Sequence, residues 1–459
     1  MLSGKDGFRR RAFLGGACNI ALAGANLPLL AAAASSGEKV DFDTPYNRFG
    51  TDSVKWDAQV RRYGKDSIVA GMGISDTDFR TAPAITKALA TRLKHENWGY
   101  LDMPQSFLEA IVGWNKRRYG IDIHPDRMLL STGVHPSIVS ALRAFSPPGS
   151  KVLLLTPAYD GFFGDIAAAG CKPEECPLKR VGGRYQIDLE TLDRHISRDT
   201  NSLILCNPNN PTGNVWSFDD LTAVGELCTR RRVVVLVDEI HCDFVTQGYK
   251  YTPYCLLNNR EVVMNSVTFK SASKSFSLSA MKCGWMFSDN ADYIARIAAT
   301  GHSGDINTLG VIAARAAYAE GEDWLNQLVA YIDGNHDFVE NFLRENVPLI
   351  QYAKAQGTYL AWLDVSAVVA KIGAKEQAAE ANRGRAEAAR PVTAEMIVQD
   401  FLVKEAKVQI NAGTAYGLGG EGHMRMNIAT SRRTLEVALT NVASALRGPV
   451  TYKMYRLRS

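Results

Sequence analysis

The 459-residue chain lacks the patterns that mark several classes of protein. It has no block of basic residues interleaved with aromatics, and its net charge of +4 is small for its length, so no nucleic-acid partner is expected. A disordered composition is absent as well, because 46% hydrophobic and 22% charged residues are ordinary for a soluble globular protein. The composition therefore predicts a folded chain with a large core.

Cysteine is scarce and is not arranged in C-x-x-C pairs. Of the eight cysteines, Cys18 lies in the N-terminal stretch, and the others are odd in number and scattered: Cys171, Cys176, Cys206, Cys228, Cys242, Cys255 and Cys283. This spacing predicts neither a disulfide framework nor a zinc site, and we expect no metal. It is typical of a protein that folds in the cytoplasm.

Long apolar runs are missing except at the N-terminus. Arg9-Arg10-Arg11-Ala12-Phe13-Leu14 opens a Gly- and Ala-rich stretch that ends at Ala31-Ala32-Ala33-Ala34. A charged start, an apolar middle and a small-residue exit predict an export signal over residues 1–34, cleaved near Ala33 or Ala34. An uncleaved membrane anchor is the less favoured alternative, because Asn19, Asn26 and Pro28 interrupt the apolar run.

The paired arginines of this stretch resemble a twin-arginine signal, which exports a chain that is already folded. Arg9 and Gly15 depart from the usual pattern, and Gly15 also disfavours a lipoprotein cleavage before Cys18. We predict an exported, periplasmic protein with no stable membrane insertion, and a cytoplasmic one if the signal is not functional.

Beyond this stretch, apolar runs alternate with helical patterns, which is typical of a sheet wound from βα units. The runs are continuous rather than alternating, so we expect helices on both faces of a mostly parallel sheet. Polar clusters follow four of these runs, and open α/β sheets bind ligands at such strand ends. The clusters begin at Ser131, Thr156, Asn207 and Asp238.

The length favours more than one lobe. We predict an arm with part of the small domain over residues 35–80, a large domain over 81–323, a smaller α+β domain over 324–450 and a tail over 451–459. A long amphipathic helix is expected over 324–346 and a strand over 357–365. Residues 371–391 are rich in Ala, Glu and Arg and show no apolar face, which predicts a solvated helical insertion or a flexible loop.

The stretch Ser271-Ala272-Ser273-Lys274-Ser275-Phe276 carries the chemistry around which the other motifs are arranged. A lysine among small hydroxyl residues, after the β-branched run Val267-Thr268-Phe269, is well placed to hold an aldehyde cofactor and its phosphate. A partly desolvated amine near other cations has a lowered pKa and becomes nucleophilic near neutral pH. We interpret Lys274 as a Schiff-base lysine; taken alone, the segment also fits a serine-rich surface loop.

The other strand ends each allow a second interpretation when viewed alone. Gly133 opens a helix whose free amides suit a phosphate, or it is an ordinary glycine turn. Tyr159 either lies against an aromatic ring or fills the core. Asp238 ends an apolar strand and should face a cation, either a protonated pyridine nitrogen or an arginine. His241 and Asn210 could hydrogen-bond a phenolic oxygen of a cofactor.

Together these motifs resemble the class I/II aminotransferase family of pyridoxal-phosphate (PLP) enzymes. The resemblance covers about Val40 to Val450 and is greatest to the MalY/PatB cystathionine β-lyase branch. It implies the fold type I architecture, with a mostly parallel central sheet in a large domain and a smaller α+β domain. The resembling stretches are Asp76-Thr77-Asp78-Phe79, Trp98-Gly99-Tyr100, Thr156 to Phe162, Asn207-Pro208-x-Asn210-Pro211-Thr212-Gly213, Asp238-Glu239-Ile240-His241, Ser271-Ala272-Ser273-Lys274 and Gly357 to Asp364.

The resemblance implies roles around the cofactor ring. Lys274 would attach the cofactor, Asp238 would pair with the pyridine nitrogen, and Tyr159 would stack on the ring. Asn210 and His241 would face the phenolic oxygen. The phosphate would be surrounded by Gly133, Val134, Ser271 and Ser273, with Lys282 where many aminotransferases have arginine and Tyr100 reaching the phosphate of the neighbouring subunit in a homodimer.

Arg425 matches the family arginine that binds the substrate α-carboxylate, a task that suits its forked donors. The expected activity is β-elimination on cysteine S-conjugates such as cystathionine, which releases a thiol, pyruvate and ammonia. Only the resemblance to the branch favours it over transamination of an unidentified amino acid. A catalytically silent binding or regulatory protein that keeps the cofactor pocket is a third hypothesis.

Overall fold

The computed structural model describes residues 39–301, 306–386, 390–450 and 452. The predicted export signal lies outside the described residues. No helix in the described part is long and apolar enough to span a membrane. In the same part of the chain, no three or more His, Cys, Asp and Glu side chains are grouped so that they could hold a metal ion.

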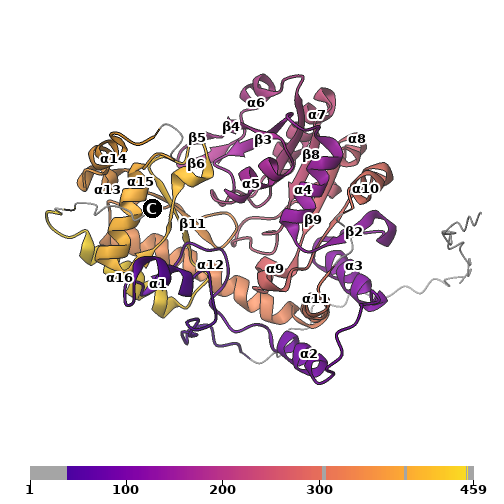
Figure 1. Cartoon of the computed structure of the whole chain (residues 1–459), viewed down its shortest axis with the longest axis horizontal. Helices are drawn as coiled ribbons and strands as arrows, with labels where there is room; N and C mark the ends of the chain where they lie inside the picture. Colours follow the sequence, from indigo (N-terminus) through magenta and orange to yellow (C-terminus); the bar gives the residue numbers. More distant parts are fainter. Residues whose placement is uncertain (1–38, 302–305, 387–389, 451, 453–459) are drawn as a thin grey trace, which may run out of the picture. The chain divides into compact units, whose positions relative to one another are not determined.

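A seven-stranded sheet forms the centre of the larger part of the fold (Figure 1). Its order is β2-β10-β9-β8-β7-β3-β4, and its neighbouring strands are parallel except that β10 is antiparallel to both β2 and β9. This confirms the predicted fold class, a mostly parallel α/β sheet. The strands are β2 (Met128–Ser131), β3 (Lys151–Thr156), β4 (Lys172–Pro177), β7 (Thr200–Cys206), β8 (Val234–Asp238), β9 (Ser266–Lys270) and β10 (Gly284–Phe287).

Helices cover both faces of this sheet, which explains the continuous apolar runs. In β8, Val234 and Leu236 face one cluster of core side chains, and Val235 and Val237 face another. The first cluster includes residues of α4 (Val134–Phe145), α5 (Gly161–Ala168) and α10 (Ala291–Ala298); the second includes residues of α6 (Leu189–His195), α7 (Phe218–Arg231) and α8 (Arg260–Met264). Successive residues of β8 are therefore buried whichever face of the sheet they point to.

A third apolar cluster lies beside the sheet and joins distant parts of the chain. Helices α2 (Pro83–Leu93), α3 (Gln105–Tyr119) and α11 (Thr308–Glu320) pack together there, with α9 (Ala272–Ser275) contributing Ala272. The helix α2 begins at Pro83, with Ala82 preceding it. A separate hairpin, β5 (Lys179–Val181) with β6 (Arg184–Gln186), follows β4.

The C-terminal residues build a separate apolar core, called here the C-terminal core, around a three-stranded sheet, β11-β14-β13. Its strands are β11 (Leu360–Asp364), β13 (Asn411–Ala412) and β14 (His423–Asn427), and its helices are α13 (Ser366–Lys371), α14 (Ala374–Asn382), α15 (Ala394–Phe401) and α16 (Arg432–Ala445). The domain boundaries at 80, 323 and 450 remain a prediction. One long helix, α12 (Glu322–Asn346), contributes Leu328 to the third cluster and Val339 to the C-terminal core.

The expectation that residues 371–391 lack an apolar face is wrong. Ala374 and Ala378 of α14 are buried in the C-terminal core, where Ala381 also packs. The amide of Asn382 donates to the Val392 carbonyl at 2.8 Å, which holds the segment onto the following chain. Alanines one turn apart form an apolar stripe too narrow to stand out in composition.

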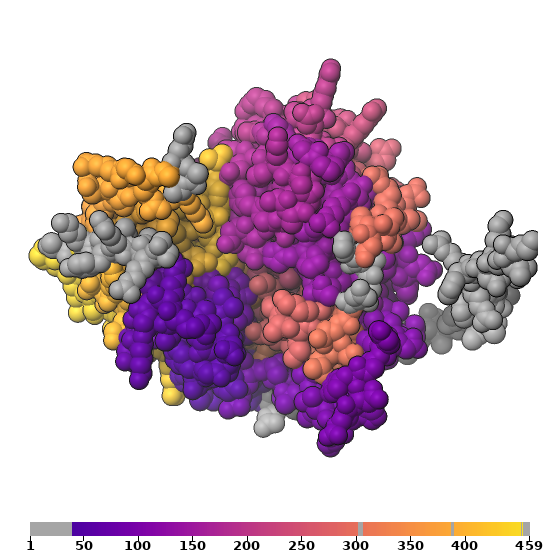
Figure 2. Space-filling view, viewed as in Figure 1, coloured from indigo at the N-terminus to yellow at the C-terminus, as the bar shows by residue number. Residues whose placement is uncertain are grey.

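The N-terminal arm contacts both lobes (Figure 2). Phe42 packs with the third cluster, and α1 (Asp57–Tyr63) precedes β1 (Ala70–Gly71). The strand β1 pairs in parallel with β12 (Val408–Gln409), and Met72 enters the C-terminal core. The arm therefore brings residues 73–78 between the two lobes, next to the site described below.

Candidate active site

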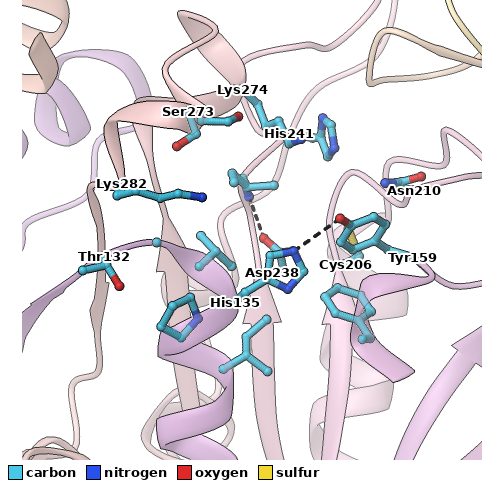
Figure 3. Close-up of a pocket in the computed structure, with 17 residues that line it drawn as sticks. Thr132, His135, Tyr159, Cys206, Asn210, Asp238, His241, Ser273, Lys274 and Lys282 are labelled. Atoms are coloured by element: carbon cyan, nitrogen blue, oxygen red, sulfur yellow. Dashed lines mark hydrogen bonds between the residues drawn. The ribbon is translucent and has the colours of Figure 1, made fainter. Parts of the chain in front are cut away.

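A cavity of about 510 Å³ lies at the carboxyl ends of the central strands (Figure 3). Its volume is in the range of small-ligand sites. Among the residues that line it are Gly133, Val134, Tyr159, Asn210, Asp238, His241, Ser273, Lys274 and Lys282. The structure thus brings together residues that the sequence places on five separate strand ends or loops.

Lys274 lies in the short helix α9, directly after β9. Ser271 caps this helix, since its hydroxyl accepts the amide of Ser273 at 3.0 Å. The amine of Lys274 donates to the backbone carbonyl of Ser75 at 2.8 Å. Burial, reinforced by the charge of Arg425, lowers the pKa of Lys274 to about 8, so a substantial neutral fraction exists near neutral pH.

Asp238 ends β8 and is 4% exposed. Its carboxylate accepts the backbone N–H of Ile240 at 3.0 Å. Burial raises the pKa of Asp238 to about 6, against the Ile240 hydrogen bond and the charges of His135 and Lys274, which lower it. A buried carboxylate that lacks a cationic partner is energetically costly, so any further cation that enters the cavity would stabilise the ionised form of Asp238.

His241 follows Asp238 into the loop and is 1% exposed. Burial, together with the charges of Lys274 and Arg425, holds the pKa of His241 well below its ordinary value. The imidazole is therefore neutral at physiological pH. Its Nδ1 has no hydrogen-bond partner among the described residues, although it is buried.

Arg425 reaches the site from β14 of the C-terminal sheet and is 2% exposed. Its Nη1 donates to Asn210 Oδ1 at 3.1 Å, and its Nη2 donates to the Gly73 carbonyl at 2.6 Å. Its Nε is buried without a partner among the described residues. The guanidinium also lies 5.0 Å from the centre of the Tyr416 ring.

Hydroxyls, amides and a lysine gather at the opposite end of the cavity from Asn210 (Figure 3). Gly133 precedes the first turn of α4, so the free N–H groups of this helix are available to an anion. Thr132, Ser273 and Lys282 also line this end, and Lys282 points into the cavity (Figure 3). The combination is suited to a phosphate group.

A family model described as aminotransferase class I and II matches residues 67–442. The chain belongs to this family. It is 34% identical to cystathionine β-lyase PatB of Bacillus subtilis over 89% of this chain and 100% of PatB. It is 28% identical to protein MalY of Escherichia coli over 89% of this chain and 99% of MalY.

The same architecture occurs in cystalysin from Treponema denticola, whose crystal structure contains a PLP cofactor. The TM-score is 0.80 at 26% identity, over 89% of this chain and 98% of cystalysin. PLP is the cofactor of the class I and II aminotransferase family.

The residues present fit this cofactor. Lys274 would hold its aldehyde carbon, and Asp238 would face the pyridine nitrogen, a cation when protonated. The unpartnered Nδ1 of buried His241 fits a polar substituent of the ring. The first turn of α4, with Ser273, fits the phosphate.

Three predicted residues lie outside the cavity lining, although one of them, Arg425, contacts Asn210 of that lining. Ser271 is 6% exposed, and its hydroxyl donates to the Cys283 carbonyl at 2.7 Å. It therefore holds the start of α9 in place and does not face the cavity. Tyr100 is fully exposed on the loop between α2 and α3. Its predicted reach into a neighbouring subunit stays a prediction.

Sequence reasoning missed other residues of the site. Thr132 and His135 line the cavity beside the predicted Gly133, and Ser279 lines it near Lys282. Thr132 and His135 lie in a stretch that the sequence already marked, so their polar character was an available signal. The carbonyls of Gly73 and Ser75 had none, because every residue type carries a backbone carbonyl.

Proposed function

We propose that this protein is a PLP-dependent carbon–sulfur β-lyase that acts on cysteine S-conjugates such as cystathionine. The observation that carries this proposal is the 34% identity to cystathionine β-lyase PatB over the whole of that enzyme. The assembled site supports it, because it provides an amine, a carboxylate and a guanidinium in the places that the chemistry requires.

When bound, PLP supplies an aldehyde that condenses with amines and a ring that accepts the electron pair of a carbanion. The chain's own residues then have three tasks. Lys274, with its lowered pKa, takes the α-proton of the substrate as its neutral amine. Asp238 holds the ring nitrogen in its protonated form. Arg425 binds the α-carboxylate with its two terminal nitrogens and so fixes the α-carbon relative to Lys274.

With a sulfur leaving group on the β-carbon, loss of the α-proton is followed by loss of the thiolate. With one water consumed, the products are a thiol, pyruvate and ammonia. We therefore expect the purified mature protein to form pyruvate and homocysteine from cystathionine without any added keto acid. Lys274→Ala should abolish turnover, whereas a silent binding protein would keep its physiological role in this variant. Activity that depends on a keto acid would contradict the proposal.

Transamination is the second candidate, and the family description favours it. It would use the same Lys274, Asp238 and Arg425, but Lys274 would give back the proton that it took, and no leaving group would be lost. A single incubation with an amino acid that lacks a leaving group distinguishes the two functions. An aminotransferase converts its bound cofactor to the amine form, whereas a dedicated lyase leaves it unchanged.

We also propose that the chain acts as a homodimer, in which Tyr100 reaches the partner's phosphate site. The exposure of Tyr100 and the 50% exposure of Trp98, on the same loop, support this. Light scattering after gel filtration tests the dimer. Tyr100→Phe should weaken PLP binding without changing the molecular mass, and a monomeric active enzyme would overturn the proposal.

We propose, finally, that residues 1–34 export the protein to the periplasm with its cofactor already bound. The sequence pattern around Arg10 and Arg11 supports this. Replacing both arginines by lysine should leave the full-length protein in the cytoplasm. Detection of a shortened mature protein in the periplasm despite this change would contradict a twin-arginine route.

A further inference from the structure

His135 lines the cavity but has no role in the cofactor or substrate binding described so far, and it has a buried acidic partner of its own. It is the second residue of α4, and its Nδ1 lies 2.7 Å from Asp165 Oδ2. Asp165 lies on α5 and is 7% exposed. The carboxylate fixes the orientation of the imidazole, whose Nε2 then lies 3.3 Å from the Tyr159 hydroxyl (Figure 3).

Gly161 leaves the space that this arrangement needs. A Cβ at position 161 would lie 2.6 Å from His135 Cε1 and 2.7 Å from Tyr159 Cε1, and both distances are too short. Position 161 begins the helix α5, where alanine is intrinsically preferred over glycine. The missing side chain therefore has a packing reason, which is the pair of rings next to it.

The charges around His135 favour its protonated form. The Asp165 hydrogen bond raises the pKa of His135, partial burial opposes this, and Asp238 on β8 adds to the rise. Lys274 on α9 is the charge that opposes it, and Tyr159 faces the other nitrogen. The interaction is mutual, since the charges of His135 and Lys274 lower the pKa of Asp238 against the effect of burial, while the charge of Asp165 raises it.

We propose that the Asp165–His135 pair is a positioning device of the cofactor site. It is a fixed cation beside Asp238 that keeps this carboxylate ionised, and a donor that holds the hydroxyl of Tyr159. His135 acts through Asp238 and Tyr159 and is not itself a reacting group. The inference rests on PLP as the cofactor of the family and is independent of the substrate proposed above.

The proposal predicts the direction in which the pH dependence of PLP binding shifts when the charge of His135 is removed. Without the cation, the pKa of Asp238 rises further above its ordinary value, so the carboxylate takes up a proton at a higher pH. A protonated Asp238 no longer stabilises a protonated ring nitrogen. The acid-side loss of cofactor binding should therefore move to higher pH in a variant that lacks the charge.

The test uses the full chain and measures PLP binding itself, by equilibrium dialysis and by the absorbance of the bound cofactor across pH. In His135→Gln, which keeps a hydrogen-bonding side chain without the charge, we expect the acid-side midpoint to rise by about one pH unit. At pH values below that midpoint, PLP should bind about tenfold more weakly than in the wild type, because one pKa unit corresponds to a factor of ten. An unchanged midpoint would overturn the proposal.

A second variant and a matched control complete the experiment. His135→Asn removes the same charge with a shorter amide side chain and should shift the midpoint in the same direction, so it replaces His135→Gln if that variant does not fold. In Asp165→Asn, the loss of the charge on His135 is offset by the loss of a carboxylate that itself raises the pKa of Asp238, so the shift should be smaller than in His135→Gln. His124→Gln changes an exposed histidine 3.5 Å from Asp126 and should shift nothing. An equal shift in His124→Gln would also overturn the proposal. These readouts need no substrate, so a failure of the lyase assignment leaves them interpretable.

Discussion

Lys274 and Arg425 carry their amine and guanidinium in one site, with few anions to offset them. The charge of Arg425 is the second cause, after burial, of the lowered pKa of Lys274, and Asp76, Asp238 and Asp160 only partly oppose it. Arg425, which we propose binds the substrate, thus also makes Lys274 more readily deprotonated. Under this proposal, one interaction between two residues would serve both substrate recognition and the reactivity of the amine.

This coupling predicts how cofactor uptake depends on pH. Only the neutral amine of Lys274 is nucleophilic, so the rate at which cofactor-free protein takes up PLP should rise with pH through a midpoint of about 8. The rise in absorbance after mixing measures the rate. In Arg425→Met the midpoint should move to higher pH, because one cause of the lowered pKa is gone. A rate that falls across this range would contradict the prediction.

Arg425→Lys predicts a second effect at the same scale. Lysine keeps the charge but cannot present two parallel donors to a carboxylate. We expect kcat/KM on cystathionine to fall about 10- to 100-fold, the equivalent of one charged hydrogen bond. The absorbance of bound PLP should persist as the control. Equal kcat/KM in both proteins would remove Arg425 from substrate binding.

At the scale of elements, the positions of the strand ends could be predicted from the sequence, but the contacts between side chains of different helices could not. Buried parallel strands show as continuous apolar runs, so the places of Asp238 and Lys274 followed from the sequence. His135 and Asp165 come from two different helices, 30 residues apart, and no period connects them. The same holds for α14, whose alanines are buried only because the C-terminal core lies against them.

Helix α4 and strand β10 approach so closely that glycine is required at position 284. A Cβ there would lie 2.9 Å from Gly133 Cα and 3.0 Å from Gly133 C, which is backbone at the start of α4. Gly284→Ala should therefore displace the phosphate end of the cavity, weaken PLP binding about tenfold and lower the free energy of unfolding by about 1–3 kcal/mol. Equilibrium dialysis and urea unfolding measure the two effects.

Gly164→Ala is the matched control for this element. Gly164 lies in the helix α5, and an added Cβ would meet nothing within 4 Å. The change should leave PLP binding alone and raise the free energy of unfolding by up to about 1 kcal/mol, because alanine favours the helix. If both variants behaved alike, the close approach of β10 to α4 would not be what fixes the site.

At the scale of the whole described fold, residues 73–78 connect the two lobes at the site. The Gly73 carbonyl accepts from Arg425 of the C-terminal sheet, and the Ser75 carbonyl accepts from Lys274 of the large lobe. Asn427, also on β14, donates to the carbonyls of Ile74 and Asp76 at 2.6 Å. A displacement of this segment would therefore reach both lobes and the amine together.

The segment is anchored by a buried ion pair, and this gives the last prediction. Lys55 is completely buried, and its amine lies 2.8 Å from Asp78 Oδ2, while Trp56 donates to the other oxygen at 2.9 Å.

Lys55→Met removes the cation that faces the buried carboxylate of Asp78. It should lower the free energy of unfolding, measured in urea, by about 3–5 kcal/mol. The Lys116–Asp122 pair is exposed and has a similar separation of 2.7 Å, so its loss in Lys116→Met should cost at most about 1 kcal/mol. Ser75 lies three residues before Asp78 and accepts the hydrogen bond of Lys274, so Lys55→Met should also weaken PLP binding, whereas Lys116→Met should not. Equal losses of stability in the two variants would show that the segment is held by its backbone hydrogen bonds and not by the pair.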